Sequence, residues 1–377
     1  MLKILFWMNI PSHHQSAFFY ALRAAGLDVC VCYYARKDDA IYDQRLALGW
    51  KEHRALPTGE YFVRDITEAF NVIRDWRQRI HIIPGCGSRF LRKLIIYLSR
   101  CNVQWVHWSE RARGGVRWFL SYPLKLWYAR TVNHSALGAF AIGNMAIEDF
   151  VLWGINRDRI AFLPYSINGG NLEIGIDSVC KDFCSGRPAF IFVGNLCQRK
   201  ATDILIKAFA RVSRMHKEWI LILVGNDSSN GAYVQLAEQK GVRDKVLFRG
   251  IVDADKVFSC YRAAKIAILP SRFDGWGVVM NEAASMGIAL VASEKVGAAH
   301  HLICSGVNGY NVKSGSTDSL SKVMLKYMND PELYVKHGEQ SLQVYEGFTP
   351  RVNADRFIMT INTWLGSNQQ KEPHCNL

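Results

Sequence analysis

Short apolar runs alternate with amphipathic stretches of about 10 to 15 residues from Pro188 to Ser293, and this alternation restricts the fold more than any other feature of the sequence. The apolar runs lack polar alternation, which is typical of parallel strands covered on both faces. Strands are therefore predicted at 189–195, 219–226, 245–250, 265–271 and 288–293, with helices at 201–212, 231–241, 253–264 and 278–287. Elements in this order build right-handed βαβ units, which predicts a doubly wound α/β sheet.

The first half of the chain follows the same scheme less regularly. Strands are expected at 2–8, 27–35, 79–85 and 103–108, and a helix at 13–26. A chain of 377 residues exceeds what one α/β core normally holds, so two Rossmann-like doubly wound domains that face each other across a cleft are expected. The turn-forming residues before Asn171 and the polar stretch after it mark the best boundary. The predicted parts are an N-terminal domain at 1–168, a linker at 169–187, a C-terminal domain at 188–345, a helix at 346–366 that returns to the N-terminal domain, and a disordered tail at 367–377.

The charge balance points to an anionic partner. The sequence has 46 Lys and Arg residues against 33 Asp and Glu residues, which gives a net charge of +13. Within 74–130 the 12 basic residues far outnumber the acidic ones, Asp75 and Glu110, and five tryptophans are interleaved among them: Trp76, Trp105, Trp108, Trp118 and Trp127. The stretch 89–100 predicts an amphipathic helix, which is typical both of helices on anionic membranes and of ordinary helices packed on a sheet. The wider charge imbalance favours contact between 74–130 and an anionic membrane surface.

Cysteines and apolar runs restrict the compartment. The ten cysteines form no regular framework, which favours reduced thiols. Cys180 and Cys184 lack nearby His or Cys residues in the sequence, so we interpret them as solvent-tolerated thiols and not as zinc ligands. The apolar run 4–10 ends at Pro11 and predicts a first strand, and no run approaches the roughly 18 apolar residues that span a bilayer. We expect a cytoplasmic protein that associates at most peripherally with the inner face of the cell membrane.

The loop after the strand at 189–195 carries residues suited to a phosphate. Doubly wound sheets bind ligands beyond the carboxyl ends of their strands. Here a glycine ends the strand and Lys200 precedes a helix, where a lysine and free backbone amides can bind an anion. A solvated lysine beside a tight turn is the ordinary alternative.

The loop after the strand at 265–271 carries two carboxylates, Asp274 and Glu282, eight residues apart. Gly275 and Gly277 allow the backbone to approach a ligand closely. Each carboxylate can accept hydrogen bonds from a diol, one from a sugar and the other from a ribose. A capping aspartate and a surface glutamate are the ordinary alternative for such a pair.

This second loop resembles the signature of family 4 glycosyltransferases, written E-x-F/G-G...E-A-x-A-x-G, a family with the GT-B fold. Neighbouring segments, FIFVGNLCQRKATDILIKAF, VLFRGIVDADKVFSCYRAAKIAILPS and HLICSGVNGYNVKSGSTDSL, resemble family elements in the same order. The likeness covers about 189–320 in register and is faint over 1–170. It implies a GT-B, α/β protein of the EC 2.4 class: a retaining glycosyltransferase that moves a sugar from a nucleotide diphosphate (a UDP- or GDP-sugar) to a glycan or lipid-linked acceptor, in surface polysaccharide or glycolipid synthesis.

The resemblance implies roles for individual residues. Lys200 would hold the diphosphate, Glu282 the ribose, and Asp274 with the amides that follow it the transferred sugar. His107 would face that sugar from the other domain and completes the catalytic candidates. The nucleotide-sugar-binding set is Asn195, Arg199, Lys200, Gly250, Val252, Asp274, Gly275, Trp276, Gly277, Val278 and Glu282, with Gly250 and Val252 near the base. Ser12, His13 and Glu110 are the candidates on the N-domain side of the cleft.

The implied mechanism needs positioning and charge more than a nucleophile. In a retaining reaction of this kind the leaving diphosphate helps to deprotonate the acceptor on the same face of the sugar, and the protein stabilises the departing charge. No cluster of metal ligands lies at these loops. We therefore expect no metal and no cofactor beyond the nucleotide sugar as co-substrate.

The sequence departs from the family pattern at several positions. Asp274 stands where the family usually has Glu, and Asn195 where many members have a phosphate-binding Arg, for which Arg199 can substitute. Ala201 replaces a common Gly, and the glycine-rich loop of the N-terminal domain is replaced by residues 11–14. With these departures, the sequence does not determine the identity of the transferred sugar.

Three other functions compete with the transferase. Another GT-B enzyme, such as an epimerase or an inverting transferase, would not need the spaced acidic pair, Asp274 and Glu282. A basic nucleic-acid-binding protein would bind DNA or RNA with steep salt dependence, but the motifs favour a nucleotide sugar and no nucleic acid partner is expected. An inactive scaffold would bind a nucleotide diphosphate without turnover.

Overall fold

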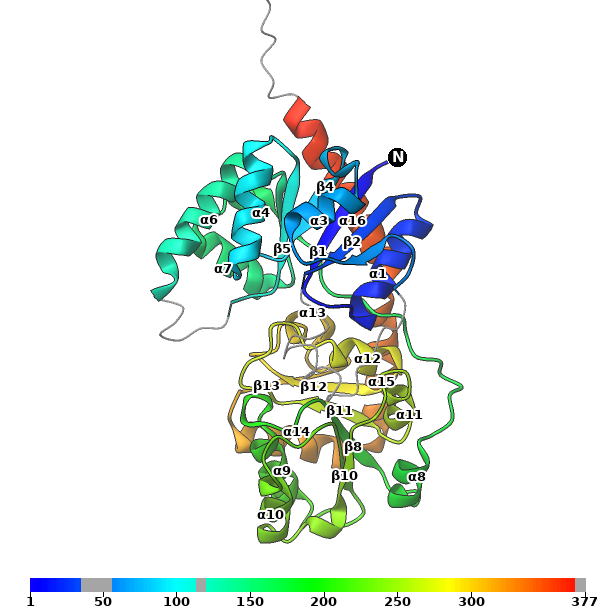
Figure 1. The fold of residues 1–377 in the computed structure, drawn as a ribbon. Helices are drawn as coiled ribbons and strands as arrows, with labels where there is room; N and C mark the ends of the chain where they lie inside the picture. The colour runs from blue at the N-terminus through cyan, green and yellow to red at the C-terminus, as the bar shows by residue number, and fades with distance from the viewer. Residues whose placement is uncertain (35–55, 113–119, 370–377) are drawn as a thin grey trace, which may run out of the picture. The chain divides into compact units, whose positions relative to one another are not determined.

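The computed structural model describes residues 1–34, 56–112 and 120–369, apart from the side chains of His13, Asn368 and Gln369. These residues form two compact units (Figure 1). Unit 1 holds the described residues up to Ser166 together with the C-terminal helix, and unit 2 holds Ile167–Thr349. None of the described helices is long and apolar enough to cross a membrane.

The core of unit 1 is a parallel sheet. Its strands are β1 (Lys3–Met8), β2 (Asp28–Tyr33), β3 (Glu60–Phe62), β4 (Ile80–Ile83), β5 (Trp105–Ser109), β6 (Gly138–Ala141) and β7 (Ile160–Phe162). They lie in the order β3-β2-β1-β4-β5-β6-β7, and every neighbouring pair is parallel. The chain order reverses between β1 and β4, so the loops that follow these two strands meet at a topological switch point.

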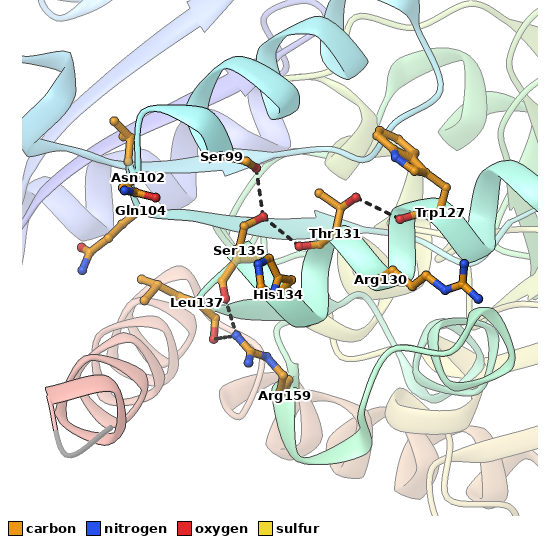
Figure 2. Close-up of a pocket in the computed structure, with 12 residues that line it drawn as sticks. Ser99, Asn102, Gln104, Trp127, Arg130, Thr131, His134, Ser135, Leu137 and Arg159 are labelled. Carbon is orange, nitrogen blue, oxygen red and sulfur yellow. Dashed lines mark hydrogen bonds between the residues drawn. The ribbon is translucent and has the colours of Figure 1, made fainter. Parts of the chain in front are cut away.

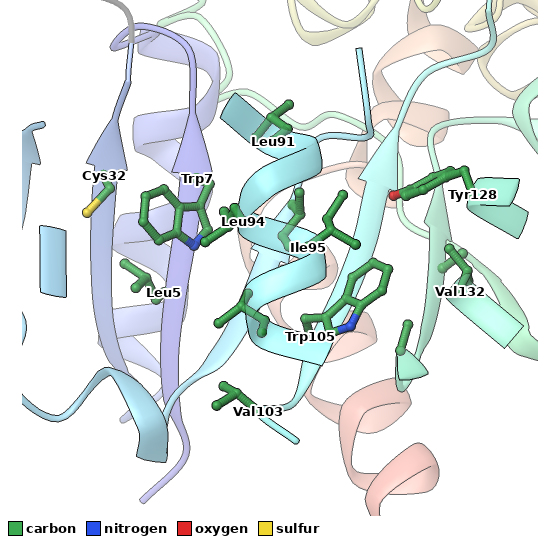
Figure 3. Close-up of a cluster of buried hydrophobic side chains, with 14 of the residues drawn as sticks. Leu5, Trp7, Cys32, Leu91, Leu94, Ile95, Val103, Trp105, Tyr128 and Val132 are labelled. Carbon is green, nitrogen blue, oxygen red and sulfur yellow. The ribbon is translucent and has the colours of Figure 1, made fainter. Parts of the chain in front are cut away.

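Helices cover the sheet of unit 1 and bury its apolar strands. They are α1 (His13–Ala24), α3 (Ile66–Val72), α4 (Arg89–Arg100), α6 (Tyr122–Ser135), α7 (Asn144–Trp153) and α16 (Pro350–Gln369). Figure 3 shows α4 directing Leu91, Leu94 and Ile95 into a cluster with the rings of Trp7 and Trp105. Burial of several such side chains, each worth about 1.5–3 kcal/mol, holds this helix on the sheet.

The amphipathic pattern at 89–100 is therefore that of a helix packed on a sheet, with its charges in water. Of the five tryptophans in 74–130, Trp76, Trp105 and Trp108 are buried, and Trp127 is half-buried. Trp118 lies outside the described residues. The three buried rings fill space between the sheet and its helices, so they give no support to contact between 74–130 and a membrane surface.

Helix α16 belongs to unit 1 although it ends the described chain. Phe357 lies against Phe6 and Phe140, with ring centroids 6.0 and 5.3 Å apart. The ring of Trp364 lies over the strand β6, where a Cβ on Gly138 would sit 2.5 Å from it. Only glycine at position 138 lets this ring pack so closely on the strand.

Unit 2 contains the second parallel sheet. Its strands are β8 (Ala189–Val193), β9 (Ile220–Val224), β10 (Val246–Gly250), β11 (Ile266–Leu269), β12 (Ala289–Ser293) and β13 (Gly309–Val312). The order is β10-β9-β8-β11-β12-β13, again with parallel neighbours. The five strands predicted from 188–293 are confirmed, and the switch point lies between β8 and β11, where the chain order reverses.

The helices of unit 2 are α8 (Ser178–Cys184), α9 (Thr202–Val212), α10 (Ala232–Gln239), α11 (Val257–Tyr261), α12 (Val279–Ser285), α13 (Ala299–Leu302), α14 (Thr317–Asn329) and α15 (Pro331–Glu346). Helix α8 lies inside the segment expected to be a linker. Burial of the side chains of Cys180 and Cys184 holds this helix against the rest of unit 2. The interpretation of these two cysteines as solvent-tolerated thiols is therefore wrong. They are among nine free cysteines in the described part of the chain.

Candidate functional site

The two loops that the sequence singled out meet at the switch point of unit 2. The loop after β8 brings in Lys200, and the loop after β11 brings in Asp274. The Lys200 ammonium and the Asp274 carboxylate form an ion pair, and their side chains are only 12% and 13% exposed. Residues 74 positions apart in the sequence thus form one partly desolvated, charged centre at the carboxyl edge of the sheet.

A second set of contacts fixes these loops against each other. Arg272 binds the Asp203 carboxylate through two parallel hydrogen bonds of 2.8 and 2.9 Å. The Arg199 guanidinium donates to the carbonyl oxygen of Phe273 at 3.1 Å, and the Arg272 amide donates to the carbonyl of Arg199. Bidentate Arg–carboxylate pairs hold geometry well, so Lys200 and Asp274 are presented on a rigid frame. Arg272 and Asp203 were not among the predicted residues, since nothing in either segment indicates their pairing.

Glu282 lies on α12 behind this ion pair. Its side chain is 6% exposed, and one of its carboxylate oxygens accepts a hydrogen bond of 3.0 Å from the Tyr261 hydroxyl. Burial raises the pKa of the Glu282 carboxyl to about 7, while the Tyr261 hydrogen bond and the positive charge of Lys200 act in the opposite direction. The influence of Lys200 connects Glu282 to the same centre. Tyr261 was not predicted, because only tertiary packing brings its hydroxyl to a carboxylate 21 positions away.

The loop before α12 offers backbone donors. The amides of residues 275–278 have no acceptor within the described part of the chain, and Gly277 has the positive φ of +92° that glycine tolerates. The side chain of Trp276 is fully buried and donates to Asn281 at 2.8 Å. Trp276 can therefore contribute its amide to a ligand but not its ring.

The remaining predicted residues of unit 2 lie at the same edge of the sheet. Gly225, which was not among the predicted residues, follows β9 with φ +137°, and a Cβ there would sit 2.0 Å from the carbonyl oxygen of Gly194. This close approach draws the ends of β8 and β9 together. Asn195 accepts a hydrogen bond of 2.8 Å from the Ser228 hydroxyl. Gly250 is exposed at the end of β10 and Val252 is half-buried beyond it, two strands away from Lys200.

Ala201, which replaces a family glycine, adopts a left-handed conformation with φ +58°. A residue with a Cβ pays steric strain in this region, whereas glycine does not. The backbone shape at the start of α9 is thus the one that glycine favours, and the departure from the family pattern lies in the side chain and not in the fold.

His107 lies on β5 of unit 1 and is held by its own surroundings. The ring is 1% exposed, its Nδ1 lies 2.7 Å from the Tyr128 hydroxyl, and its Nε2 lies 2.9 Å from the Ser109 hydroxyl. Burial lowers the pKa of His107 to about 3. Both ring nitrogens thus have hydrogen-bond partners within unit 1, and burial favours the neutral ring.

The other candidates of unit 1 lie at the carboxyl edge of its sheet. Ser12 follows β1, is buried, and is the N-cap residue of α1. The helix begins at His13, whose side chain lies outside the described residues. Glu110 follows β5 and is half-buried, and its carbonyl accepts a hydrogen bond from Ser109.

One group of potential metal ligands occurs among the described residues, formed by Asp177, Cys180 and Cys260. The expectation that Cys180 lacks a cysteine neighbour is therefore wrong. In the folded chain, α11 places Cys260 beside Cys180. The Arg249 guanidinium binds both oxygens of the Asp177 carboxylate at 2.9 Å. A cation thus already neutralises this carboxylate, which explains how it is accommodated beside two thiols.

Comparison with known proteins relates the segment that carries this geometry to a family. Residues 181–344 match the family model of glycosyl transferases group 1. This segment, less than half of the chain, is therefore similar to the group 1 glycosyl transferases. The match contains Lys200, Asp274 and Glu282, and the chain on either side of it is outside the matched region.

Curated relatives agree with the family of this segment. The chain is 29% identical over 205 residues to the lipopolysaccharide core biosynthesis mannosyltransferase LpcC of Rhizobium leguminosarum, covering 52% of this chain and 57% of LpcC. It is 26% identical over 208 residues to a D-inositol 3-phosphate glycosyltransferase of Nocardia farcinica, covering 52% and 46%. The chain therefore spans about half the length of these curated relatives.

A solved structure extends the likeness to the whole chain at the level of fold. The crystal structure of Anabaena HepE in complex with UDP matches with a TM-score of 0.73 and 15% identity, covering 96% of this chain and 100% of HepE. The predicted GT-B fold, with two Rossmann-like doubly wound domains, is confirmed.

Proposed function

We propose that the protein is a retaining glycosyltransferase that takes a sugar from a nucleotide diphosphate donor, a UDP- or GDP-sugar. The observation that carries this proposal is the convergence of Lys200, Asp274 and Glu282 at the switch point of unit 2, inside the group 1 segment. Ligands of doubly wound sheets bind at this position. The names of LpcC, a mannosyltransferase, and of HepE, solved with UDP, support the same reaction class.

In this proposal each residue has a positioning or electrostatic role. Lys200 exchanges its contact with Asp274 for the donor diphosphate and stabilises the charge that develops as the phosphate leaves. Asp274 and the amides of 275–278 then hold the hydroxyls of the sugar, and Glu282 accepts hydrogen bonds from the ribose. The departing phosphate oxygen takes the proton of the acceptor hydroxyl on the same face, so the anomeric configuration is retained.

The acceptor side is proposed from charge. The exposed basic residues Arg89, Lys93 and Arg100 lie along α4. Each basic residue near an anionic lipid surface is worth about 1 kcal/mol, which supports a glycan or lipid-linked acceptor at the inner face of the membrane. Polysaccharide or glycolipid synthesis fits such an acceptor, and LpcC is named for lipopolysaccharide core synthesis.

A donor screen tests the proposal. Thermal unfolding of the full chain would be followed with UDP, GDP, ADP and their sugars, and the best donor would then be assayed for hydrolysis and transfer. NMR of the product tells a retained anomeric configuration from an inverted one. We expect one of these nucleotide diphosphates to raise Tm, and the sugar of the corresponding nucleotide sugar to be transferred with retention of the anomeric configuration. No response to any nucleotide would contradict the donor site, and binding without turnover would favour an inactive scaffold.

A further inference from the structure

A cavity of about 720 Å³ lies in unit 1 at the edge of the sheet opposite to Ser12 and Glu110. It opens where the chain enters β5, β6 and β7, and the ends of α4 and α6 complete its wall (Figure 2). Because these strands are parallel, their amino ends share one edge and their carboxyl ends share the other. The cavity therefore has no part in the switch point of its own sheet, and its size is within the range of small-molecule sites.

The walls of this cavity carry positive charge without a carboxylate. None of its lining residues, all of which are described, is Asp or Glu. Arg130 and His134 lie one turn apart on α6 and therefore share a face of the helix. Neither side chain makes a hydrogen bond or an ion pair to any described residue. Arg159, from the opposite wall, donates to the backbone carbonyls of Ala136 and Leu137 and has no acidic partner among the described residues.

One donor in the cavity is buried and unused. The Nε atom of Arg159 is buried and has no hydrogen-bond partner in the described part of the chain. A buried charged donor without an acceptor costs free energy, which a bound anion would recover. Since the Nη2 atom of Arg159 is held by backbone carbonyls, the guanidinium is oriented before any ligand arrives.

The neutral groups of the wall are already paired with one another. The Ser99 and Ser135 hydroxyls lie 2.9 Å apart, and Ser135 donates to the carbonyl of Thr131 at 2.8 Å. The Thr131 hydroxyl in turn donates to the carbonyl of Trp127 at 2.9 Å (Figure 2). These hydroxyls hold the end of α4 against α6, and the charged groups remain as the donors that can face a ligand.

We propose that this cavity binds the phosphate group of an organic phosphomonoester, at a site separate from the nucleotide-sugar site of unit 2. Arg130, His134 and Arg159 supply several donors around one anion, which suits the three acceptor oxygens of a phosphomonoester better than a single carboxylate. The cavity is much larger than a phosphate ion, and the half-buried ring of Trp127 gives the organic part an apolar surface. The phosphate can belong to a soluble sugar phosphate or to a lipid head group.

Hydrogen exchange on the full chain tests this site directly. The probes are glucose 6-phosphate, glucose, and phosphatidylcholine vesicles with and without phosphatidic acid, all at one ionic strength. We expect a phosphate-bearing probe to slow exchange in residues 127–137 and around Arg159, and glucose to leave it unchanged. Protection by glucose 6-phosphate identifies a soluble ligand, and protection by phosphatidic acid vesicles alone identifies a lipid one.

A matched pair of variants controls for charge. Arg130→Gln removes an exposed guanidinium that makes no hydrogen bond or ion pair to any described residue, so the protein should fold, and the affinity for the protecting probe should fall about tenfold. Arg214→Gln removes the same charge from an exposed position in unit 2 and should leave that affinity unchanged. The proposal is overturned if no phosphate-bearing probe slows exchange at 127–137, or if the two variants weaken binding equally.

Discussion

Replacement of Glu282 by glutamine should change how the stability of the protein depends on pH. Burial raises the pKa of the Glu282 carboxyl from 4.5 to about 7. In that interval the native protein keeps a proton on this group, whereas the unfolded chain does not. The native state therefore binds more protons, and the contribution of Glu282 to stability falls as pH rises from 4.5 to about 7. A glutamine at this position has no such titration.

The size of the effect follows from the shift. A difference of 2.5 pKa units between 4.5 and 7 corresponds to about 3 kcal/mol. The free energy of unfolding of Glu282→Gln minus that of the natural protein should thus increase by about 3 kcal/mol from pH 4.5 to about pH 8. Urea unfolding at several pH values measures both quantities. Taking the difference removes the titration of all other groups, which both proteins share.

An exposed glutamate provides the control. Glu238 on α10 is exposed, and its side chain makes no hydrogen bond or ion pair to any described residue, so Glu238→Gln should leave the pH dependence of the natural protein unchanged. A difference between Glu282→Gln and the natural protein that stays flat from pH 4.5 upward would refute the reasoning, because it would mean that Glu282 is ionised in the folded protein throughout.

Three further substitutions test other parts of the structure. Arg249→Met should lower the free energy of unfolding by about 1–2 kcal/mol at neutral pH, because Arg249 lowers the pKa of Asp177 to about 2. This loss should vanish as acid protonates Asp177, and urea unfolding that shows a loss independent of pH would count against the ion pair. Gly225→Ala should lower stability by about 3 kcal/mol or more, since its Cβ would clash with the carbonyl of Gly194, and an unchanged Tm would disprove this. His107→Gln should lower the free energy of unfolding by about 2 kcal/mol, because it breaks buried hydrogen bonds, and should preserve the rise in Tm caused by a nucleotide. Full stability together with lost turnover would instead support a catalytic role for His107.

Much of unit 2 could be predicted because its strands are long, apolar and central. Each predicted strand between 189 and 293 appears with its ends shifted by a few residues at most. In unit 1 the strands β3, β6 and β7 escaped prediction, since three or four residues such as those of Gly138–Ala141 carry no periodic signal. Helix α8 was missed for a different reason, because burial of Cys180 beside Cys260 depends on packing between distant segments.

The candidate site was predictable only where topology brings loops together. The carboxyl ends of β8 and β11 must be neighbours at a switch point, and this places Lys200 beside Asp274. Tyr261 could not be predicted in the same way, because no spacing rule relates a hydroxyl on α11 to a carboxylate on α12. The burial of three tryptophans of 74–130 could not be predicted, because counting residues in a segment ignores which side of the sheet each one faces.

The affinity of the chain for UDP and GDP, measured by titration calorimetry, tests the central claim most directly. Lys200→Ala removes the ammonium that the account assigns to the diphosphate. Lys207→Ala removes a lysine of α9, the helix that follows Lys200, and the Lys207 side chain is 43% exposed. The account predicts that Lys200→Ala raises the Kd of the better nucleotide by about tenfold or more, whereas Lys207→Ala leaves it unchanged. Equal affinities for both variants and the natural protein would contradict it.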